Sequence, residues 1–98
     1  MNAAERESHP KTYIHTLLES IVYTIVDSPR DIAIYEEYDH VEQTAAFRVE
    51  VFSPDDAYRL MRGHVGDAIR NIIVCAGMKQ NLRLRFHIEH KCVTTKNR

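Results

Sequence analysis

The chain has 98 residues, of which 44% are hydrophobic and 28% charged; this is the size and balance of one globular domain, and nothing suggests a second core. Its formal net charge is −1, whereas dedicated nucleic-acid binders usually carry a clear basic excess, so any nucleic-acid surface must be local or weak. No apolar run approaches the roughly 20 residues of a membrane span, and residues 1–10 lack the apolar stretch of a secretory signal, so we expect a cytoplasmic protein.

The first predicted element is a helix over residues 11–27, where apolar side chains recur at helical spacing until Ser28-Pro29 interrupts them. Two strands follow over residues 31–38 and 43–52, each with one apolar and one polar face. Because only a short polar stretch separates these strands, we expect them to form a hairpin.

A short helix is predicted after Ser53, which is a natural cap, with Pro54 at the first helical position. Asp55 and Asp56 favour the positive end of that helix. The helix is expected to end at Gly63, because a residue without a β-carbon can adopt the left-handed conformation of a helix terminus.

A second helix is predicted from near Gly66 to Gln80-Asn81, with a wide apolar face that includes Cys75. We assign Cys75 to the core, because apolar surroundings would raise its pKa and make it a poor nucleophile. Residues 82–89 alternate strictly between apolar and polar side chains, which predicts a final strand.

The predicted order is therefore helix, strand, strand, helix, glycine loop, helix, strand. Since each strand has one apolar face, we expect an α+β domain whose three-stranded sheet is covered by helices on one face and open to water on the other. We divide the chain into a flexible N-terminal segment (residues 1–10), the domain (residues 11–89) and a polar tail (residues 90–98).

The loop Gly63-His64-Val65-Gly66 joins the last two helices with almost no connecting chain. Its glycines allow another backbone to approach, because no side chain is in the way. The free N–H groups at the start of the following helix suit a phosphate. Glycines at such a corner can also serve only tight packing, but the hairpin before the loop and the strand after it favour phosphate binding.

From Ser53-Pro54-Asp55-Asp56 through the glycine loop to Ala68-Ile69-Arg70, the chain resembles a KH domain with the type II order of elements. It resembles most closely the small stand-alone bacterial KH proteins of the KhpA family, over nearly the whole chain. The resemblance implies a GXXG loop that clamps about four nucleotides of single-stranded RNA, with no catalysis and no cofactor. It also implies a post-transcriptional regulator or RNA chaperone, with a second KH-domain protein or a second copy as partner.

The resemblance also assigns candidate RNA-binding residues. The loop itself is expected to hold the backbone, its flanking arginines to reach phosphates, and apolar side chains to form the floor of a groove for bases. Met61, Val65 and Ile69 are the floor candidates, and Met61 and Ile69 suit core packing at least as well. The candidate set is Arg62, Gly63, His64, Val65, Gly66, Ile69 and Arg70.

The loop departs from the family pattern in its charge. The family usually has a basic residue in the variable pair and another just after the loop, whereas this chain has His64-Val65 and then Asp67. Histidine is mostly neutral at pH 7, and Asp67 repels a phosphate. These features favour an alternative, in which a degenerate KH domain serves as a protein-interaction or dimerisation module with little RNA affinity.

Other groups of residues carry weaker signals. Arg48, Arg83 and Arg85, with His87 nearby, share the outer sheet face as a second basic patch or, as we expect, as a solvated face balanced by Glu50 and Glu89.

His87, His90 and Cys92 lie close in sequence, but a structural zinc site needs four ligands, so we expect no metal. With Cys75 and Cys92 as the only cysteines, no disulfide framework is expected. We expect no enzyme, because no residues combine a nucleophile, a base and a cleft. We interpret the acidic residues Glu36, Glu37, Asp39 and Glu42 as a solvated turn without a pocket.

Overall fold

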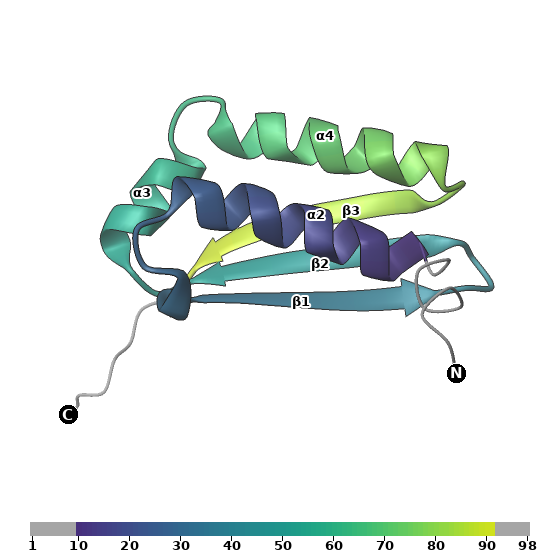
Figure 1. Cartoon of the computed structure of the whole chain (residues 1–98), viewed down its shortest axis with the longest axis horizontal. Helices are drawn as coiled ribbons and strands as arrows, with labels where there is room; N and C mark the ends of the chain where they lie inside the picture. Colours follow the sequence, from purple (N-terminus) through teal and green to yellow (C-terminus); the bar gives the residue numbers. More distant parts are fainter. Residues whose placement is uncertain (1–9, 92–98) are drawn as a thin grey trace.

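The computed structural model of the chain describes residues 10–91 (Figure 1). All predicted elements are present, with bounds that differ from the prediction by one or two residues. The N-terminal segment 1–9 and residues 92–98, with Cys92, lie outside the described residues. The elements are α2 (Pro10–Ile25), the 3-10 turn η1 (Pro29–Asp31), β1 (Ile32–Asp39), β2 (Thr44–Val51), α3 (Pro54–Met61), α4 (Val65–Lys79) and β3 (Arg83–His90).

The three strands form one mixed sheet in the order β1-β2-β3. Strands β1 and β2 form the predicted antiparallel hairpin, and β3 runs parallel to β2. A parallel neighbour requires a crossover connection, and the helices α3 and α4 supply it. The chain is thus an α+β domain with three helices packed on one face of a three-stranded sheet (Figure 1).

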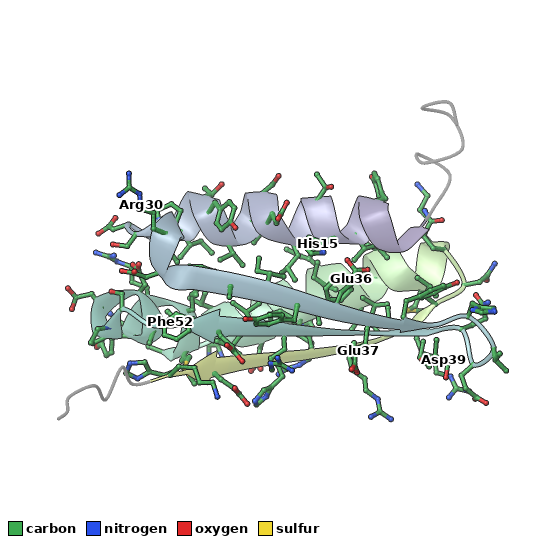
Figure 2. All side chains as sticks on the ribbon, turned by 90° about the horizontal axis from the view of Figure 1, so that it is seen from below. His15, Arg30, Glu36, Glu37, Asp39 and Phe52 are labelled. Carbon is green, nitrogen blue, oxygen red and sulfur yellow. The ribbon has the colours of Figure 1, made fainter. Side chains whose placement is uncertain are left out.

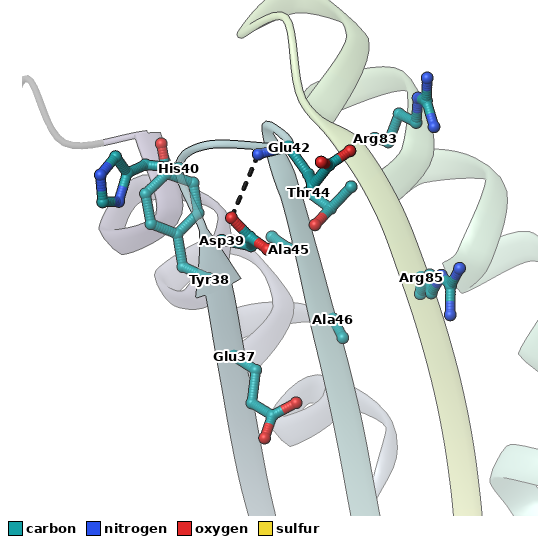
Figure 3. Close-up of a pocket in the computed structure, with 10 residues that line it drawn as sticks. All are labelled: Glu37, Tyr38, Asp39, His40, Glu42, Thr44, Ala45, Ala46, Arg83 and Arg85. Atoms are coloured by element: carbon teal, nitrogen blue, oxygen red, sulfur yellow. Dashed lines mark hydrogen bonds between the residues drawn. The ribbon is translucent and has the colours of Figure 1, made fainter.

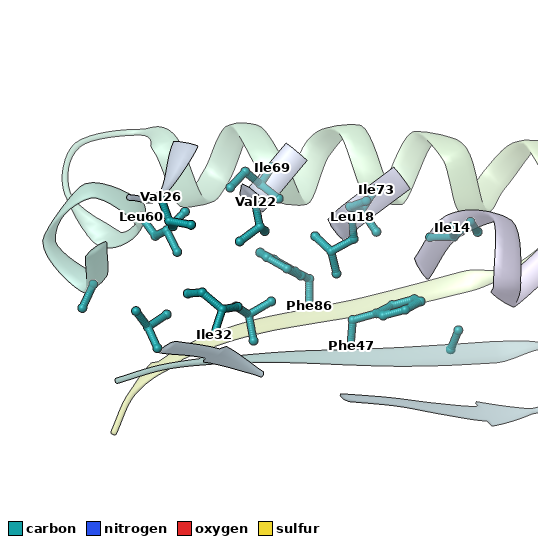
Figure 4. Packing of buried hydrophobic residues seen from close by; sticks show 14 of the residues in the cluster. Ile14, Leu18, Val22, Val26, Ile32, Phe47, Leu60, Ile69, Ile73 and Phe86 are labelled. Carbon is teal, nitrogen blue, oxygen red and sulfur yellow. The ribbon is translucent and has the colours of Figure 1, made fainter. Parts of the chain in front are cut away.

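The core lies between the helices and the sheet (Figure 4). Phe47, Val49 and Val51 point from β2 into this layer, as the alternation predicts, and each is at most 2% exposed. Helix α4 lies so close to β3 that a β-carbon on Gly77 would lie 2.6 Å from the Leu84 side chain. The position of α4 over β3 therefore depends on a residue without a side chain.

Asp56 connects the start of α3 to the end of α2. Its side chain is fully buried, and its two carboxylate oxygens accept hydrogen bonds from the N–H groups of Asp27 and Ser28, both at 2.9 Å. Arg59 adds a hydrogen bond of 3.0 Å. Ser53 caps the helix as predicted, accepting from the N–H of Asp56. Asp56 therefore has a structural role beyond the favourable helix-end charge that the sequence predicts.

Two predictions about side-chain position are wrong. Cys75 is exposed rather than part of the core, because α4 buries only one side of its wide apolar surface. Glu36 does not belong to a solvated turn; it lies on the helix-covered face of β1 and forms a hydrogen bond with the His15 imidazole of α2. Figure 2 shows this pair between helix and sheet, with Glu37 on the opposite face.

Candidate functional site

The corner between α3 and α4 is formed by residues 62–64, which separate the end of α3 from the start of α4. Gly63 has φ +57°, the left-handed conformation that L side chains rarely adopt. A β-carbon on Gly63 would meet no other atom within 4 Å. The corner is thus open to solvent, and its glycine is required by backbone conformation rather than by close packing.

The N-terminus of α4 has free hydrogen-bond donors. His64 occupies the capping position but makes no side-chain capping bond. The N–H groups of Val65 and Ala68 bond to the carbonyls of Arg62 and His64 at 3.3 and 2.9 Å. Within residues 10–91 the backbone N–H groups of Gly66 and Asp67 have no backbone acceptor. Free N–H groups at the positive end of a helix form a site for an anion.

A hollow of about 180 Å³ lies beside the corner, between α3, α4 and β3. Gly66 stands at its inner edge: a β-carbon there would lie 3.3 Å from the Leu60 carbonyl and 3.7 Å from the Ile88 side chain. A glycine at this position therefore allows the start of α4 to pack closely against the end of α3. The hollow is lined by Leu60, Met61, Gly63, Gly66, Asp67, Arg70, His87 and Ile88.

The charges around the corner partly cancel. Arg62 is exposed, and its guanidinium lies 4.9 Å from the centre of the Tyr58 ring. Arg70 donates to the Asp67 carboxylate at 2.8 Å and lies 5.9 Å from the centre of the Phe86 ring. Two guanidinium groups thus flank the free N–H groups, and a neighbouring carboxylate binds one of them.

Most of the candidate RNA-binding residues lie at the corner, but Ile69 is buried. Arg62, Gly63, His64 and Arg70 are exposed, and Val65 is half-buried against the core. Ile69 is only 2% exposed and belongs to the core, so a ligand in the hollow cannot contact it.

Met61 lines the hollow and is half exposed. His87 and Ile88 also line it, although the sequence did not assign them to the site. The alternation in β3 places Ile88 on the face of the sheet that the helices cover. His87 and Ile88 come to lie beside α4 only because β3 pairs with β2 as an edge strand.

The outer sheet face forms a second candidate surface. Arg48 lies opposite His87 on the neighbouring strand, and Arg83 and Arg85 follow along β3, so these residues share one face as predicted. A hollow of about 790 Å³ lies over this face (Figure 3). Three of the four acidic residues, Glu37, Asp39 and Glu42, line it, so the expectation that they lie away from any pocket is wrong.

Within residues 10–91, no group of three or more histidine, cysteine or acidic side chains has a geometry that could hold a metal ion. His87 and His90 are three positions apart in β3 and therefore point to opposite faces of the sheet. In the same part of the chain, no helix is both long and apolar enough to cross a membrane.

Comparison with known proteins identifies no relative of this chain. No family of proteins matches the sequence, no curated protein matches it, and no solved structure matches the fold.

Proposed function

We propose that this chain is a single-stranded RNA-binding protein of the KH type, in which the corner at residues 63–66 holds the phosphate backbone. The observation that carries the proposal is the open corner itself: free N–H groups at the start of α4, with no side chain over Gly63 and a hollow directly beside them. The helix-strand-strand-helix-GXXG-helix-strand order is the one that the resemblance to KH domains implies.

We propose that the corner binds a phosphate and the hollow binds a base. A phosphate accepts hydrogen bonds from the N–H groups of Gly66 and Asp67, and Arg62 approaches it from the end of α3. An adjacent base enters the hollow against the apolar side chains of Met61 and Ile88. This is positioning without chemistry, so we propose a cytoplasmic post-transcriptional factor rather than an enzyme.

The expected affinity is low. Arg62 and Arg70, with His64 beside them, would neutralise about two or three phosphates, and single-strand affinity falls with salt at a logarithmic slope of roughly −0.7 per phosphate. We therefore expect a logarithmic slope of about −1.5 to −2.

The test compares Gly63→Asp with Gly63→Asn. Both side chains fit the open space and both are tolerated in the left-handed conformation, so only the aspartate adds a negative charge. Fluorescence anisotropy with mixed-sequence single-stranded RNA at low salt should show affinity at least about tenfold lower for the aspartate variant than for the asparagine variant. Equal affinities for the two folded variants, or no binding by the unaltered protein, would contradict the proposal.

A protein-interaction module remains the second candidate, because the Asp67–Arg70 ion pair places a carboxylate beside the corner. In that case the corner packs against a protein surface, and charge at Gly63 affects that contact instead. Absence of RNA binding at low salt, together with a measurable complex that Gly63→Asp weakens, would favour this second function.

A further inference from the structure

The open face of the sheet carries opposite charges on its two edge strands. Glu37 and Asp39 extend from β1, and Arg83 and Arg85 extend from β3 (Figure 3). Within residues 10–91 no ion pair involves Glu37, Arg83 or Arg85. The face thus has an acidic column and a basic column whose charges are not paired within the described part of the chain.

Short side chains separate the two columns. Ala46 and Thr44 occupy the central strand at the levels where the charged residues stand on either side, and the 790 Å³ hollow lies above them. Strands are spaced by about 4.8 Å, so the columns are roughly 10 Å apart and cannot easily meet across β2. Another molecule can, however, approach the floor of this trough closely.

The strand register places the opposite charges at matching levels. Glu37 pairs with Ala46, which pairs with Arg85, so these three residues form one row across the sheet. Asp39, Thr44 and Arg83 form the next row. Each row therefore runs from an acid through a small residue to a base.

We infer that the open face binds a second copy of this chain, with the two-fold axis parallel to β2. Two faces that pack against each other are related by an axis in the plane between them. A two-fold axis along β2 places β1 of one copy over β3 of the other and leaves the position along the strands unchanged. Glu37 of one copy therefore lies over Arg85 of the other, and Asp39 lies over Arg83. An axis across the strands would instead place β1 over β1, acid over acid.

The two remaining rows of the face, Tyr35–Arg48–His87 and Ala33–Glu50–Glu89, are compatible with this arrangement. Arg48 and Glu50 both lie on β2 near the axis, so each would approach the same residue of the other copy; within each copy, however, Arg48 donates to Glu50 at 2.9 Å and lies over the Tyr35 ring at 4.6 Å. Tyr35, which is 47% exposed, would lie over His87. The like charges at the axis are thus compensated within each copy.

The size of the face limits the strength of the dimer. Three strands of eight residues cover roughly 26 by 14 Å, or about 370 Å² per copy, compared with about 800 Å² per partner in a standard interface. The dimer should therefore form only at high protein concentration. Since it depends on exposed charges, salt should dissociate it.

The test exchanges the charges at one row. The unaltered protein should show concentration-dependent dimerisation by analytical ultracentrifugation at low salt, and dissociate near 1 M salt, where the screening length is about 3 Å. Glu37→Arg and Arg85→Glu should each weaken the dimer by about tenfold or more, because like charges then face each other. Lys79→Glu, which changes net charge as Arg85→Glu does but lies at the exposed end of α4, should have little effect.

A mixture of the two variants gives the decisive result. When Glu37→Arg meets Arg85→Glu, both contacts of the row join opposite charges again, so the mixture should form a heterodimer although neither variant forms a homodimer. A monomeric unaltered protein, dimers that survive the single substitutions, or a mixture that stays monomeric would each overturn the inference. Loss of RNA affinity in monomeric Arg85→Glu would show instead that the basic column contacts RNA.

Discussion

At the scale of single residues, Asp67 has two opposing effects. Its carboxylate lies in the first turn of α4, where a negative charge stabilises the helix by about 0.3–1 kcal/mol. The same carboxylate binds Arg70 and repels an incoming phosphate. Both partners of this pair are well exposed, with side-chain exposures of 46% and 67%, so the pair contributes little to stability. A phosphate can therefore displace Asp67 from Arg70 at small cost.

We predict that Asp67→Asn raises the affinity for single-stranded RNA and makes it more dependent on salt. Removing the carboxylate frees Arg70 and adds about one effective phosphate contact, which steepens the logarithmic salt slope by about 0.7. The melting temperature should fall slightly, because the favourable helix-end charge is lost. Anisotropy titrations at several salt concentrations measure both effects, with Glu42→Gln on the distant hairpin as control. Unchanged affinity and slope would show that Arg70 does not contact the ligand.

At the scale of elements, the corner depends on how α3 is attached to its neighbours. Asp56 joins the start of this short helix to the segment that follows α2. Burial raises the pKa of Asp56, but the hydrogen bonds from Asp27 and Ser28 and the charge of Arg59 outweigh it, so its pKa lies below the ordinary value of 3.8. The ionised carboxylate therefore stabilises the fold fully above that ordinary pKa. This contribution is lost as the pH falls through the lowered pKa of the folded state.

Asp56→Asn should lower the free energy of unfolding by about 1–3 kcal/mol at neutral pH, because the amide group cannot accept from both N–H groups and leaves one unsatisfied. The variant should also show a weaker loss of stability between pH 5 and pH 2 than the unaltered protein, by the linkage described above. Urea unfolding at a series of pH values measures both effects. Asp55→Asn in the same helical turn is exposed and should change stability by no more than about 0.5 kcal/mol. Equal effects of the two substitutions would remove the structural role assigned to Asp56.

At the scale of the whole molecule, the sequence predicts where the helices and strands lie, but it does not predict how β3 pairs within the sheet. Period-2 and helical patterns place every α-helix and β-strand within two residues, and the glycine corner follows from Gly63 alone. The parallel pairing of β3 has no local signal, and with it the contribution of His87 and Ile88 to the hollow could not be predicted. Cys75 was misplaced because α4 is apolar around more of its surface than the sheet can cover.

The corner and the open face together imply how a dimer would bind a longer RNA. The proposed two-fold axis runs along β2 and preserves position along the strands, so both corners lie at the same end of the dimer. Each corner lies beside the C-terminal half of its own β3, where His87 and Ile88 line the hollow. A single RNA strand can then occupy both corners, and the second contact is made at the high effective concentration of a tethered ligand.

We therefore predict that affinity rises with RNA length beyond the sum of independent sites. An oligonucleotide of about four bases fills one corner, whereas one several times longer should bind at least about tenfold more tightly at protein concentrations that support the dimer. Arg85→Glu should abolish this gain without changing the affinity for the short oligonucleotide, and an equal mixture with Glu37→Arg should restore it. If the gain persists in the monomeric variant, the long RNA follows a continuous surface of one copy, and the two corners do not act together.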